Sequence, residues 1–511
     1  MHLGVDFGTT RTIVARADRG NYPVVGFQDA DGDPQDFFPS LIALRGDDLV
    51  FGFEALAAAR AGAPSLRSVK RVLGDPGVSA DTAVALGGRE FALLPLLTGF
   101  LTALRRALAE SSDVAADLAA PDVPLHTVAS VPAHAHSAQR FLTLEAFRQA
   151  GFDVAGLVNE PSAAGFEYTH RLGRTLTSRR DRVLVYDLGG GTFDASLVAV
   201  TGASHEVLGS VGVNRLGGDD FDAVLADLAL AAAGRPALDE AAFATLLAEC
   251  QEAKERLSPQ SRRISLEVAG QPVLVRVDEF YAAVTPLVQA SLEAMTPLLP
   301  VLEDAVPEDV RGLEQVAGLY LVGGGSGLPL VPRLLRERFG RRVHRSSYPA
   351  ASTAIGLAIA ADPDSGYALA DRLWRGFGVF RELDSGRAVG FDQLLDRDTP
   401  LPEGGPIEVR RRYRAAHNLG WFRFVEYSGI AGEGGGGGAA LGEPRGDLAP
   451  FAEVRFGFDP ALQGRDLAGV AVTRRPDGPV IEETYTLDAN GIVTVTITDT
   501  DTGHRQVHSL G

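Results

Sequence analysis

Residues 183–194 read Val183-Leu184-Val185-Tyr186-Asp187-Leu188-Gly189-Gly190-Gly191-Thr192-Phe193-Asp194, and an apolar run follows at Ala195-Ser196-Leu197-Val198. This pattern predicts a buried strand, a tight glycine turn and a returning strand. Glycine tolerates positive φ and has no Cβ, so backbone N–H groups in such a turn can converge on an anion such as phosphate. Asp187 and Asp194 would repel a bare phosphate, which favours a hard cation such as Mg²⁺ between carboxylates and phosphate. Taken alone, the stretch also fits a hairpin that binds nothing.

A second copy of the pattern opens the chain. Residues 2–15 read His2-Leu3-Gly4-Val5-Asp6-Phe7-Gly8-Thr9-Thr10-Arg11-Thr12-Ile13-Val14-Ala15, which is again a strand, an aspartate, a Gly-Thr turn and an apolar returning strand. Two such hairpins far apart in the sequence predict two related lobes, each with one phosphate-binding turn. A nucleotide between the lobes would be held from both sides.

A third glycine turn lies at Leu319-Tyr320-Leu321-Val322-Gly323-Gly324-Gly325-Ser326-Gly327-Leu328-Pro329. It reads as a buried strand that runs into a turn, with an amphipathic helix expected over residues 331–339. A helix N-terminus behind glycines can bind an anion or a nucleoside, and Pro329 suits the first turn of that helix. A dinucleotide fingerprint is the alternative, but no acidic residue follows at the spacing that such a site requires.

The three motifs resemble the phosphate-1, phosphate-2 and adenosine motifs of the actin-like ATPase superfamily. The intervening sequence is similar to the seventy-kilodalton heat-shock chaperones (DnaK-like), and the similarity covers nearly the whole chain. It is carried by segments that include Ser68-Val69-Lys70-Arg71, Ser130-Val131-Pro132-Ala133, Val158-Asn159-Glu160-Pro161 and Leu216-Gly217-Gly218-Asp219. The resemblance implies an α/β actin-like (ribonuclease H-like) ATPase domain of two lobes, followed by an all-β sandwich domain.

We expect four parts along the chain. Lobe I of the nucleotide-binding domain should cover residues 1–180, lobe II 181–362, a linker 363–376, and a peptide-binding-like β-sandwich 377–511. Short alternating runs such as Ile492-Val493-Thr494-Val495-Thr496-Ile497 predict the sandwich, and the glycine run 434–438 predicts a flexible loop inside it. Larger family members carry a helical lid after the β-domain, and we expect this chain to lack that lid.

The resemblance also implies roles for particular residues. Lys70 would neutralise the γ-phosphate, Glu160 would orient the attacking water, and Asp187 and Thr192 complete the predicted catalytic set. Without the motif, Glu160 would read as a helix-start glutamate stabilised by the macrodipole. The predicted ligands of Mg²⁺, largely through water, are Asp6, Asp187 and Asp194. The predicted contacts to the nucleotide are Gly8, Thr9, Thr10, Arg11, Gly189, Gly190, Gly191, Gly217, Gly218, Lys254, Ser258, Gly323, Gly324 and Gly325.

Lysine usage supports two of these assignments. Of the 48 lysines and arginines, only Lys70 and Lys254 are lysine, and both fall where the family places a lysine at the nucleotide. Lysine is a compact point charge on a flexible stem, whereas arginine is a planar fork. A site shaped for an ammonium group would not accept the fork without loss.

The chain departs from the family pattern at several positions. Gln251 stands where an acid is usual, Glu255 where a basic residue is usual, and Gly327 replaces the arginine that follows the adenosine-motif glycines. Because the two side chains that commonly sandwich adenine are missing, we expect weaker or less base-selective ATP binding than in a typical member. Gly156 replaces an arginine that often receives a J-domain co-chaperone, which argues against that contact here.

Composition limits the classes of function. A net charge of −18 argues against a general nucleic-acid or membrane-surface binder, since both surfaces are polyanionic. The single cysteine, Cys250, excludes an internal disulfide and fits a reducing compartment. No signal-peptide core precedes Asp6, and the most apolar run, residues 91–104, is broken by Pro95 and Gly99. We therefore expect a cytoplasmic protein.

We interpret the chain as an ATP-dependent chaperone-like protein. With ATP or ADP and Mg²⁺ as cofactors, slow hydrolysis would be coupled to binding and release of unfolded or extended apolar polypeptide, with co-chaperones as further partners. Two alternatives remain open: a sugar-kinase-like phosphotransferase on the same fold, and a nucleotide-regulated binding protein without chaperone cycling. Phosphorylation of a small acceptor would support the first, and nucleotide-dependent sedimentation would support the second.

Overall fold

The computed structural model describes residues 1–29, 31–75, 77–120, 123–132, 135–213, 215–298, 315–373, 375–383, 387–397, 399–402, 404–430 and 444–510. The chain forms two compact units, which we describe separately. The first comprises Met1–Val72, Ala80–His134 and Leu144–Leu369, and the second comprises Leu73–Ser79, Ala135–Thr143 and Ala370–Gly511. The loop predicted at 434–438 lies outside the described residues. In the part described, no helix combines the length and the apolar character needed to cross a bilayer.

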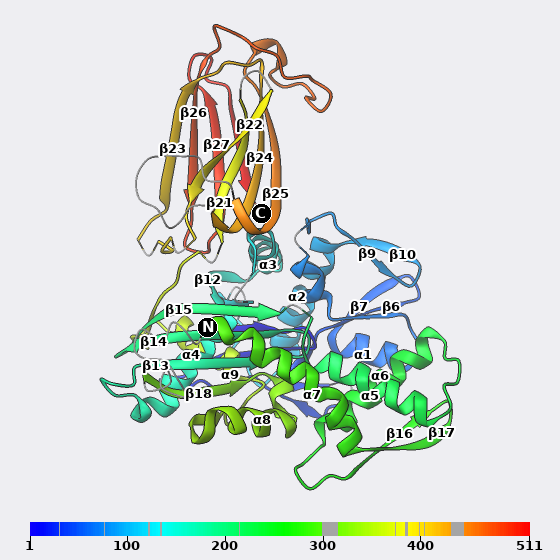
Figure 1. Cartoon of the computed structure of the whole chain (residues 1–511). Coiled ribbons are helices and arrows are strands. Elements are labelled where there is room, and N and C mark those ends of the chain that lie inside the picture. Colours follow the sequence, from blue (N-terminus) through cyan, green and yellow to red (C-terminus); the bar gives the residue numbers. More distant parts are fainter. Residues whose placement is uncertain are drawn as a thin grey trace. The chain divides into compact units, whose positions relative to one another are not determined.

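Lobe I is built on a five-stranded mixed sheet with the strand order β12-β11-β1-β2-β5. Figure 1 labels β12 of this sheet. The predicted opening hairpin is present: β1 (His2–Phe7) pairs antiparallel with β2 (Arg11–Arg16) and parallel with β11 (His126–Val131). Successive residues of a strand face opposite sides, so Leu3, Val5 and Phe7 share one buried face. Gly4 faces α9 (Ser352–Ala361), and a Cβ on Gly4 would lie only 2.2 Å from the Ala358 nitrogen. Glycine therefore allows this helix to lie directly on the sheet.

Shorter elements complete the first part of the chain. Phe7 contacts Phe100 of α2 at 5.5 Å between ring centroids, which anchors the sheet to that helix. Between residues 27 and 175 the elements are β3 (Phe27–Gln28), β4 (Pro34–Gln35), β5 (Phe38–Pro39), β6 (Leu41–Arg45), β7 (Asp48–Phe51), α1 (Gly52–Arg60), β8 (Ser65–Arg67), the 3₁₀ helix η1 (Val69–Gly74), β9 (Ala83–Leu86), β10 (Arg89–Ala92), α2 (Leu93–Glu110), α3 (Ser137–Gln149), β12 (Asp153–Asn159), α4 (Glu160–Leu172) and η2 (Gly173–Thr175).

Lobe II repeats the arrangement on a six-stranded sheet with the order β19-β18-β13-β14-β15-β20. Strand β13 (Arg182–Leu188) pairs antiparallel with β14 (Phe193–Thr201), with Asp187 opposite Asp194, and parallel with β18 (Val316–Val322). Each lobe thus carries one hairpin whose first strand ends at an aspartate and a glycine turn. Strand β20 (Ala368–Ala370) lies inside the predicted linker and extends this sheet, where the Ala368 amide donates to the Ala203 carbonyl at 3.2 Å.

Helices and a further hairpin cover lobe II. Their apolar residues form one core with Leu184, Tyr186 and Phe193 of the β13–β14 hairpin. The strands on both sides of the glycine turn are therefore fixed by core packing. The elements are β15 (Ser204–Val213), α5 (Gly218–Ala232), α6 (Glu240–Glu255), β16 (Arg263–Val268), β17 (Gln271–Arg276), α7 (Val277–Ala294), η3 (Thr296–Leu298), η6 (Gly324–Gly327), α8 (Leu330–Phe339), η7 (Gly340–Arg342) and β19 (Val343–Arg345).

The second unit contains the predicted β-sandwich, with one sheet ordered β22-β21-β24-β25 and the other β23-β26-β27-β28. Burial alternates along β26, so Ile481, Tyr485 and Leu487 join the core between the sheets. The strands are β21 (Gly376–Leu383), β22 (Ala388–Leu395), β23 (Ile407–Arg414), β24 (Leu419–Ile430), β25 (Pro444–Gly457), β26 (Val480–Leu487), β27 (Val493–Asp499) and β28 (Arg505–Leu510), with η9 at Pro460–Leu462. The predicted fold class, an α/β actin-like two-lobed domain and an all-β sandwich, is confirmed.

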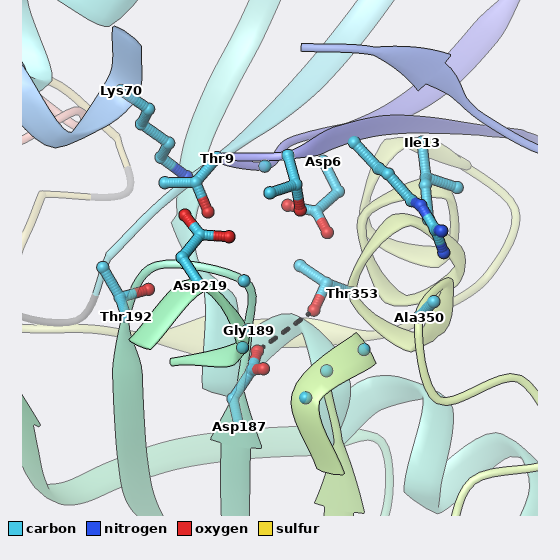
Figure 2. A pocket seen from close by; sticks show the side chains of 18 of the residues that line it. Asp6, Thr9, Ile13, Lys70, Asp187, Gly189, Thr192, Asp219, Ala350 and Thr353 are labelled. Carbon is cyan, nitrogen blue, oxygen red and sulfur yellow. Dashed lines mark hydrogen bonds between the residues drawn. The ribbon is translucent and has the colours of Figure 1, made fainter. Parts of the chain in front are cut away.

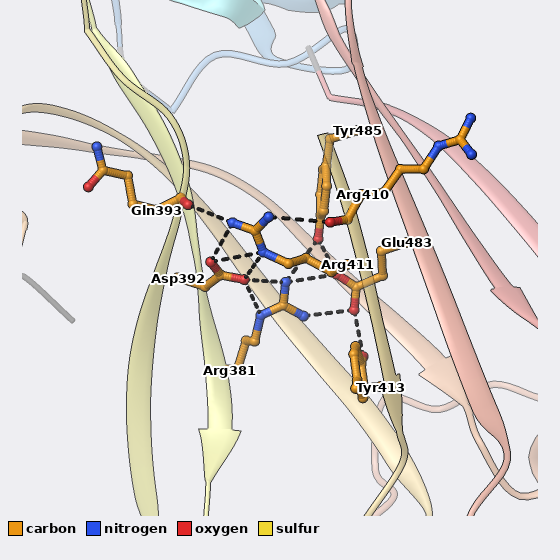
Figure 3. Close-up of polar contacts among 8 residues, drawn as sticks. All are labelled: Arg381, Asp392, Gln393, Arg410, Arg411, Tyr413, Glu483 and Tyr485. Carbon is orange, nitrogen blue, oxygen red and sulfur yellow. Dashed lines mark hydrogen bonds and ion pairs between the residues drawn. The ribbon is translucent and has the colours of Figure 1, made fainter. Parts of the chain in front are cut away.

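A charged cluster that the sequence did not predict lies between the two sheets of the sandwich (Figure 3). The Glu483 carboxylate has a fully buried side chain and accepts from both terminal nitrogens of Arg381 at 2.7 Å. Tyr413 and Tyr485 donate their hydroxyls to the same carboxylate, and Asp392 accepts from Arg381 at 2.8 Å. Burial alone would lower the pKa of Arg381, but the bonds to Glu483 raise it above its ordinary value. The cluster thus links strands of opposite sheets by charge rather than by apolar packing.

Candidate functional site

A cavity lies between the two lobes of the first unit, and residues of all three glycine motifs line it. Figure 2 shows Asp6 and Thr9 of lobe I pointing toward the same space as Asp187 and Asp219 of lobe II. The predicted residues that line the cavity are Asp6, Gly8, Thr9, Thr10, Arg11, Lys70, Glu160, Asp187, Gly189, Gly190, Thr192, Gly218, Lys254, Gly323, Gly324 and Gly325.

Four predicted residues do not line the cavity. Asp194 is buried opposite Asp187 in the hairpin, and the Gly191 carbonyl accepts from Arg71 at 3.1 Å. Gly217 directly precedes α5, and its amide donates to Asp220 Oδ2 at 2.8 Å. Ser258 is exposed beyond the end of α6, 3.3 Å from the Ser261 hydroxyl. These residues shape the turns around the cavity rather than its surface.

The glycine turns of the two lobes meet at the cavity. A Cβ on Gly190 would lie 2.5 Å from the Thr10 Oγ1, so the turn of lobe II directly contacts the turn of lobe I. Gly323, in the third glycine motif, has φ +80°, and a Cβ there would lie 2.3 Å from Asp187 Oδ1. Only glycine fits this backbone and this space. The three motifs, far apart in the sequence, therefore converge on one site.

Two carboxylates at the strand ends are held in place by hydroxyl groups, and the charge of Lys70 only partly offsets their burial. Ser130 donates to Asp6 Oδ1 at 2.8 Å, and Thr353 of α9 donates to Asp187 Oδ2 at 3.5 Å. Burial, and then the charge of Glu160, raise the pKa of Asp6 to about 7. Burial also raises the pKa of Asp187 well above its ordinary value, with Glu160, Asp6 and Asp194 as further causes. Burial and the neighbouring negative charges disfavour the ionised forms of both carboxylates, and a bound cation would offset this cost.

The charge of the cavity wall agrees with a cation site. Six carboxylates line the cavity (Asp6, Glu160, Asp187, Asp219, Asp222 and Glu255), against three cations (Arg11, Lys70 and Lys254). No three His, Cys, Asp or Glu side chains are grouped as a direct metal-ligand set in the described part of the chain. The excess of carboxylate oxygens suits Mg²⁺, which keeps several waters and is held through few carboxylates and phosphates.

Lys70 and Glu160 form a buried ion pair at the inner side of the cavity, with side chains 6% and 9% exposed. Lys70 lies in η1, and Glu160 is the first residue of α4. Burial alone would lower the pKa of Lys70, but the charges of Glu160 and Asp6 outweigh it and raise the pKa. Lys70 therefore stays charged beside the carboxylates, and its Nζ forms an ion pair with Glu160 Oε1.

Lys254 is fixed by contacts that sequence reasoning missed. Its Nζ donates to the Gly218 carbonyl and to Asp222 Oδ1, both at 2.7 Å. Burial raises the pKa of Asp222 to about 6, while the ion pair with Lys254 acts in the opposite direction. The pair ties α6 to the start of α5. Asp219, Asp222 and Thr353 also line the cavity although the sequence did not predict them. The three closely spaced acids of Gly217-Gly218-Asp219-Asp220-Phe221-Asp222 could have indicated the two aspartates, whereas no local pattern marks Thr353.

Three of the four positions that depart from the family pattern have guanidinium neighbours, whereas a Cβ on the fourth, Gly156, would meet only open space. Glu255 accepts from Arg11 at 2.5 Å, and Gln251 accepts from Arg67, so both residues of α6 contact lobe I. At Gly327, a Cβ would lie 3.4 Å from the Arg345 Nη2. Each of these three positions therefore has an arginine close to it, namely Arg11, Arg67 or Arg345.

Comparison with known proteins places the chain. A sequence-family model described as Hsp70 protein matches residues 106–372, just over half of the 511 residues. The "Chaperone protein HscA" of Serratia proteamaculans is 32% identical over 423 residues, and those of Enterobacter sp. and Escherichia fergusonii are 33% and 32% identical over 422 and 421 residues. Each alignment covers 78% of this chain and 64% of the relative, so the chain spans about two thirds of the length of these relatives. On this evidence and on the convergence of its three glycine motifs at one cleft, the chain belongs to the Hsp70 family, as its sequence predicts.

Proposed function

We propose that this protein is an ATP-dependent chaperone, in which slow ATP hydrolysis in the two-lobed domain is coupled to binding and release of extended apolar polypeptide by the β-sandwich. The family to which it belongs binds ATP and ADP. The observation that carries the proposal is the contact between Gly190 and Thr10, which brings the phosphate-type turns of both lobes to a cleft that contains Asp6, Asp187 and the Lys70–Glu160 pair. An arrangement of this kind can hold a triphosphate from two sides.

Phosphoryl transfer requires positioning and neutralisation of charge more than covalent chemistry. Bound Mg²⁺ would supply the charge that the phosphates and carboxylates need, and we assign its place to Asp6, Asp187 and Asp194, largely through water. Thr9, Thr10 and Thr192 would donate hydroxyls to phosphate oxygens.

Lys70 would bind the γ-phosphate. Once the phosphate competes for Lys70, Glu160 would accept a hydrogen bond from the attacking water and orient it. Their ion pair holds both side chains at the wall of the cleft.

Relatives named as chaperones support a polypeptide partner for the β-sandwich. Extended segments bind by main-chain hydrogen bonds and by burial of alternate side chains. Co-chaperones are proposed as further partners. A cytoplasmic location is also part of the proposal and is supported by a single buried cysteine, Cys250, that carries no disulfide.

The test is the steady-state ATPase rate of the full chain with and without an unfolded peptide. We expect slow basal hydrolysis that the peptide stimulates, and loss of both in Lys70→Ala. Arg19→Ala is the matched control, because Arg19 is a cation whose side chain is 91% exposed and lies away from the cavity. A wild-type protein without ATPase activity, or Lys70→Ala with the wild-type rate, would contradict the proposal. Phosphorylation of a small acceptor instead of release of phosphate would favour the phosphotransferase.

A further inference from the structure

Four polar side chains form a continuous hydrogen-bonded chain from lobe I to lobe II at the cleft. Arg11 Nη2 donates to Glu255 Oε2 at 2.5 Å, Gln251 Nε2 donates to Glu255 Oε1 at 3.0 Å, and Arg67 donates to Gln251. Arg11 begins β2 and Arg67 ends β8, whereas Gln251 and Glu255 are one turn apart on α6. The side chains of Arg11 and Glu255 are 32% and 38% exposed, so their pair lies at the open side of the cleft.

Arg11 is oriented by two contacts of different kinds. Its Cζ lies 4.6 Å from the centroid of the Phe37 ring, and its terminal nitrogen is bound by Glu255. A planar guanidinium that stacks by its face and binds a carboxylate by its edge has already lost most of its rotational freedom. Arg11 also lines the cavity, directly after Thr9 and Thr10 of the phosphate-type turn. A ligand therefore meets a preorganised cation there.

Among the three cations that line the described cavity, Arg11 is the one most accessible to a ligand. Lys70 and Lys254 have side chains only 6% and 8% exposed, and Glu160 and Asp222 hold them as buried partners. Turning either lysine to a phosphate, as the proposed function requires of Lys70, weakens a buried ion pair and therefore carries a cost that must be offset by the ligand. The exposed pair of Arg11 is weak by comparison, because water competes for both groups. Because Glu255 binds only the Nη2 of Arg11, the other nitrogens of the guanidinium can take a phosphate as an additional partner at little cost.

We propose that Arg11 sets the residence time of the bound nucleotide in this chain, and that Glu255 is its positioning residue. The inference rests on the proposed function. The Arg11 guanidinium binds phosphate oxygens from lobe I, and its ion pair with Glu255 holds α6 of lobe II closed over the nucleotide. Considered in sequence alone, Glu255 is the loss of a cation; in the structure it is half of an ion pair whose cation comes from the other lobe.

The test is the dissociation rate of a fluorescent MgADP analogue from the full chain, with MgADP affinity measured by calorimetry. Arg11→Gln and Glu255→Gln should each release the nucleotide about fivefold faster, the factor that corresponds to the upper range for an exposed ion pair. The double variant should be no faster than Arg11→Gln, because both changes remove the same contact. Added salt should speed release more in the wild type than in the double variant, because salt screens the ion pair that the double variant lacks.

Arg16→Gln is the matched control. Arg16 ends the same strand and pairs with Asp117 at 2.9 Å with a similar exposure of 29%, but it does not line the cavity, so release should be unchanged. Wild-type release rates in both single variants, or additive effects in the double variant, would overturn the inference. A wild-type chain that does not bind MgADP would overturn the proposed function and this inference with it.

Discussion

Replacement of Glu483 by glutamine should destabilise the β-sandwich far more than the same change at an exposed site. The carboxylate is fully buried, binds Arg381 twice at 2.7 Å, and accepts from Tyr413 and Tyr485 at 2.5 and 2.6 Å. Removal of one partner of a buried ion pair costs about 3–5 kcal/mol, because the other charge stays buried. Asp392 still accepts from Arg381 at 2.8 Å. We therefore expect a loss at the lower end, about 3 kcal/mol in the free energy of unfolding.

Urea unfolding followed by tryptophan fluorescence measures this loss in the full chain. Trp421 lies on β24 of the sandwich, so its emission follows the unfolding of this domain. The control is Glu408→Gln on β23, which removes an ion pair with Arg410 of 2.7 Å that is 42% exposed at the glutamate, and should cost less than about 1 kcal/mol. If the two variants agree to within about 0.5 kcal/mol, the reasoning from buried charge is refuted.

Three further predictions concern the first unit. Gly323→Ala should weaken ATP binding at least about tenfold in calorimetry, because a strained backbone costs about 1–3 kcal/mol and the Cβ would lie 2.3 Å from Asp187 Oδ1; Gly324→Ala, with open space around it, should lose less. Burial lowers the pKa of His205 to about 4 from 6.5, so between these values only the unfolded chain binds that proton. The free energy of unfolding should therefore fall by about 3 kcal/mol as the pH drops through this window, and an equally steep fall in His205→Gln would contradict the assignment. Chelation of Mg²⁺ should weaken binding of ATP far more than that of adenosine, because six carboxylates against three cations line the cleft; equal effects would argue against the metal.

The features that the sequence predicts well are those in which neighbouring residues decide the outcome. Apolar strands that end at Asp6 and Asp187 and run into glycine turns form the two hairpins as expected, since alternation and glycine act within a few residues. The repeat of this unit was sufficient to predict two lobes. The hairpin near residues 263–276 follows from the same local rule, with Ile264, Leu266 and Val268 buried on one face.

The features that the sequence does not predict depend on partners far along the chain. Along β26, Glu483 occupies the same face as Ile481 and Tyr485, so alternation alone places a charge in the core, against the rule that charges are exposed. The position becomes tolerable only when Arg381, 102 residues earlier, is brought opposite it. The extended segment at β20 is similar, because its pairing partner near Ala203 is invisible to local patterns.

The departures from the family pattern on α6 show why such positions should be judged in pairs. Glu255 and Gln251 look like losses when each is compared with the residue expected there, but their partners Arg11 and Arg67 lie 244 and 184 residues away in the opposite lobe. The expectation of weaker ATP binding rests on α6 alone and leaves these partners out, so it stays a prediction. What decides nucleotide binding is the coupling between positions on the two lobes, which single substitutions cannot separate from the cost of leaving one partner alone. Because the two arginines come from lobe I, the same contacts that compensate for the altered residues also make closure of the cleft depend on both lobes.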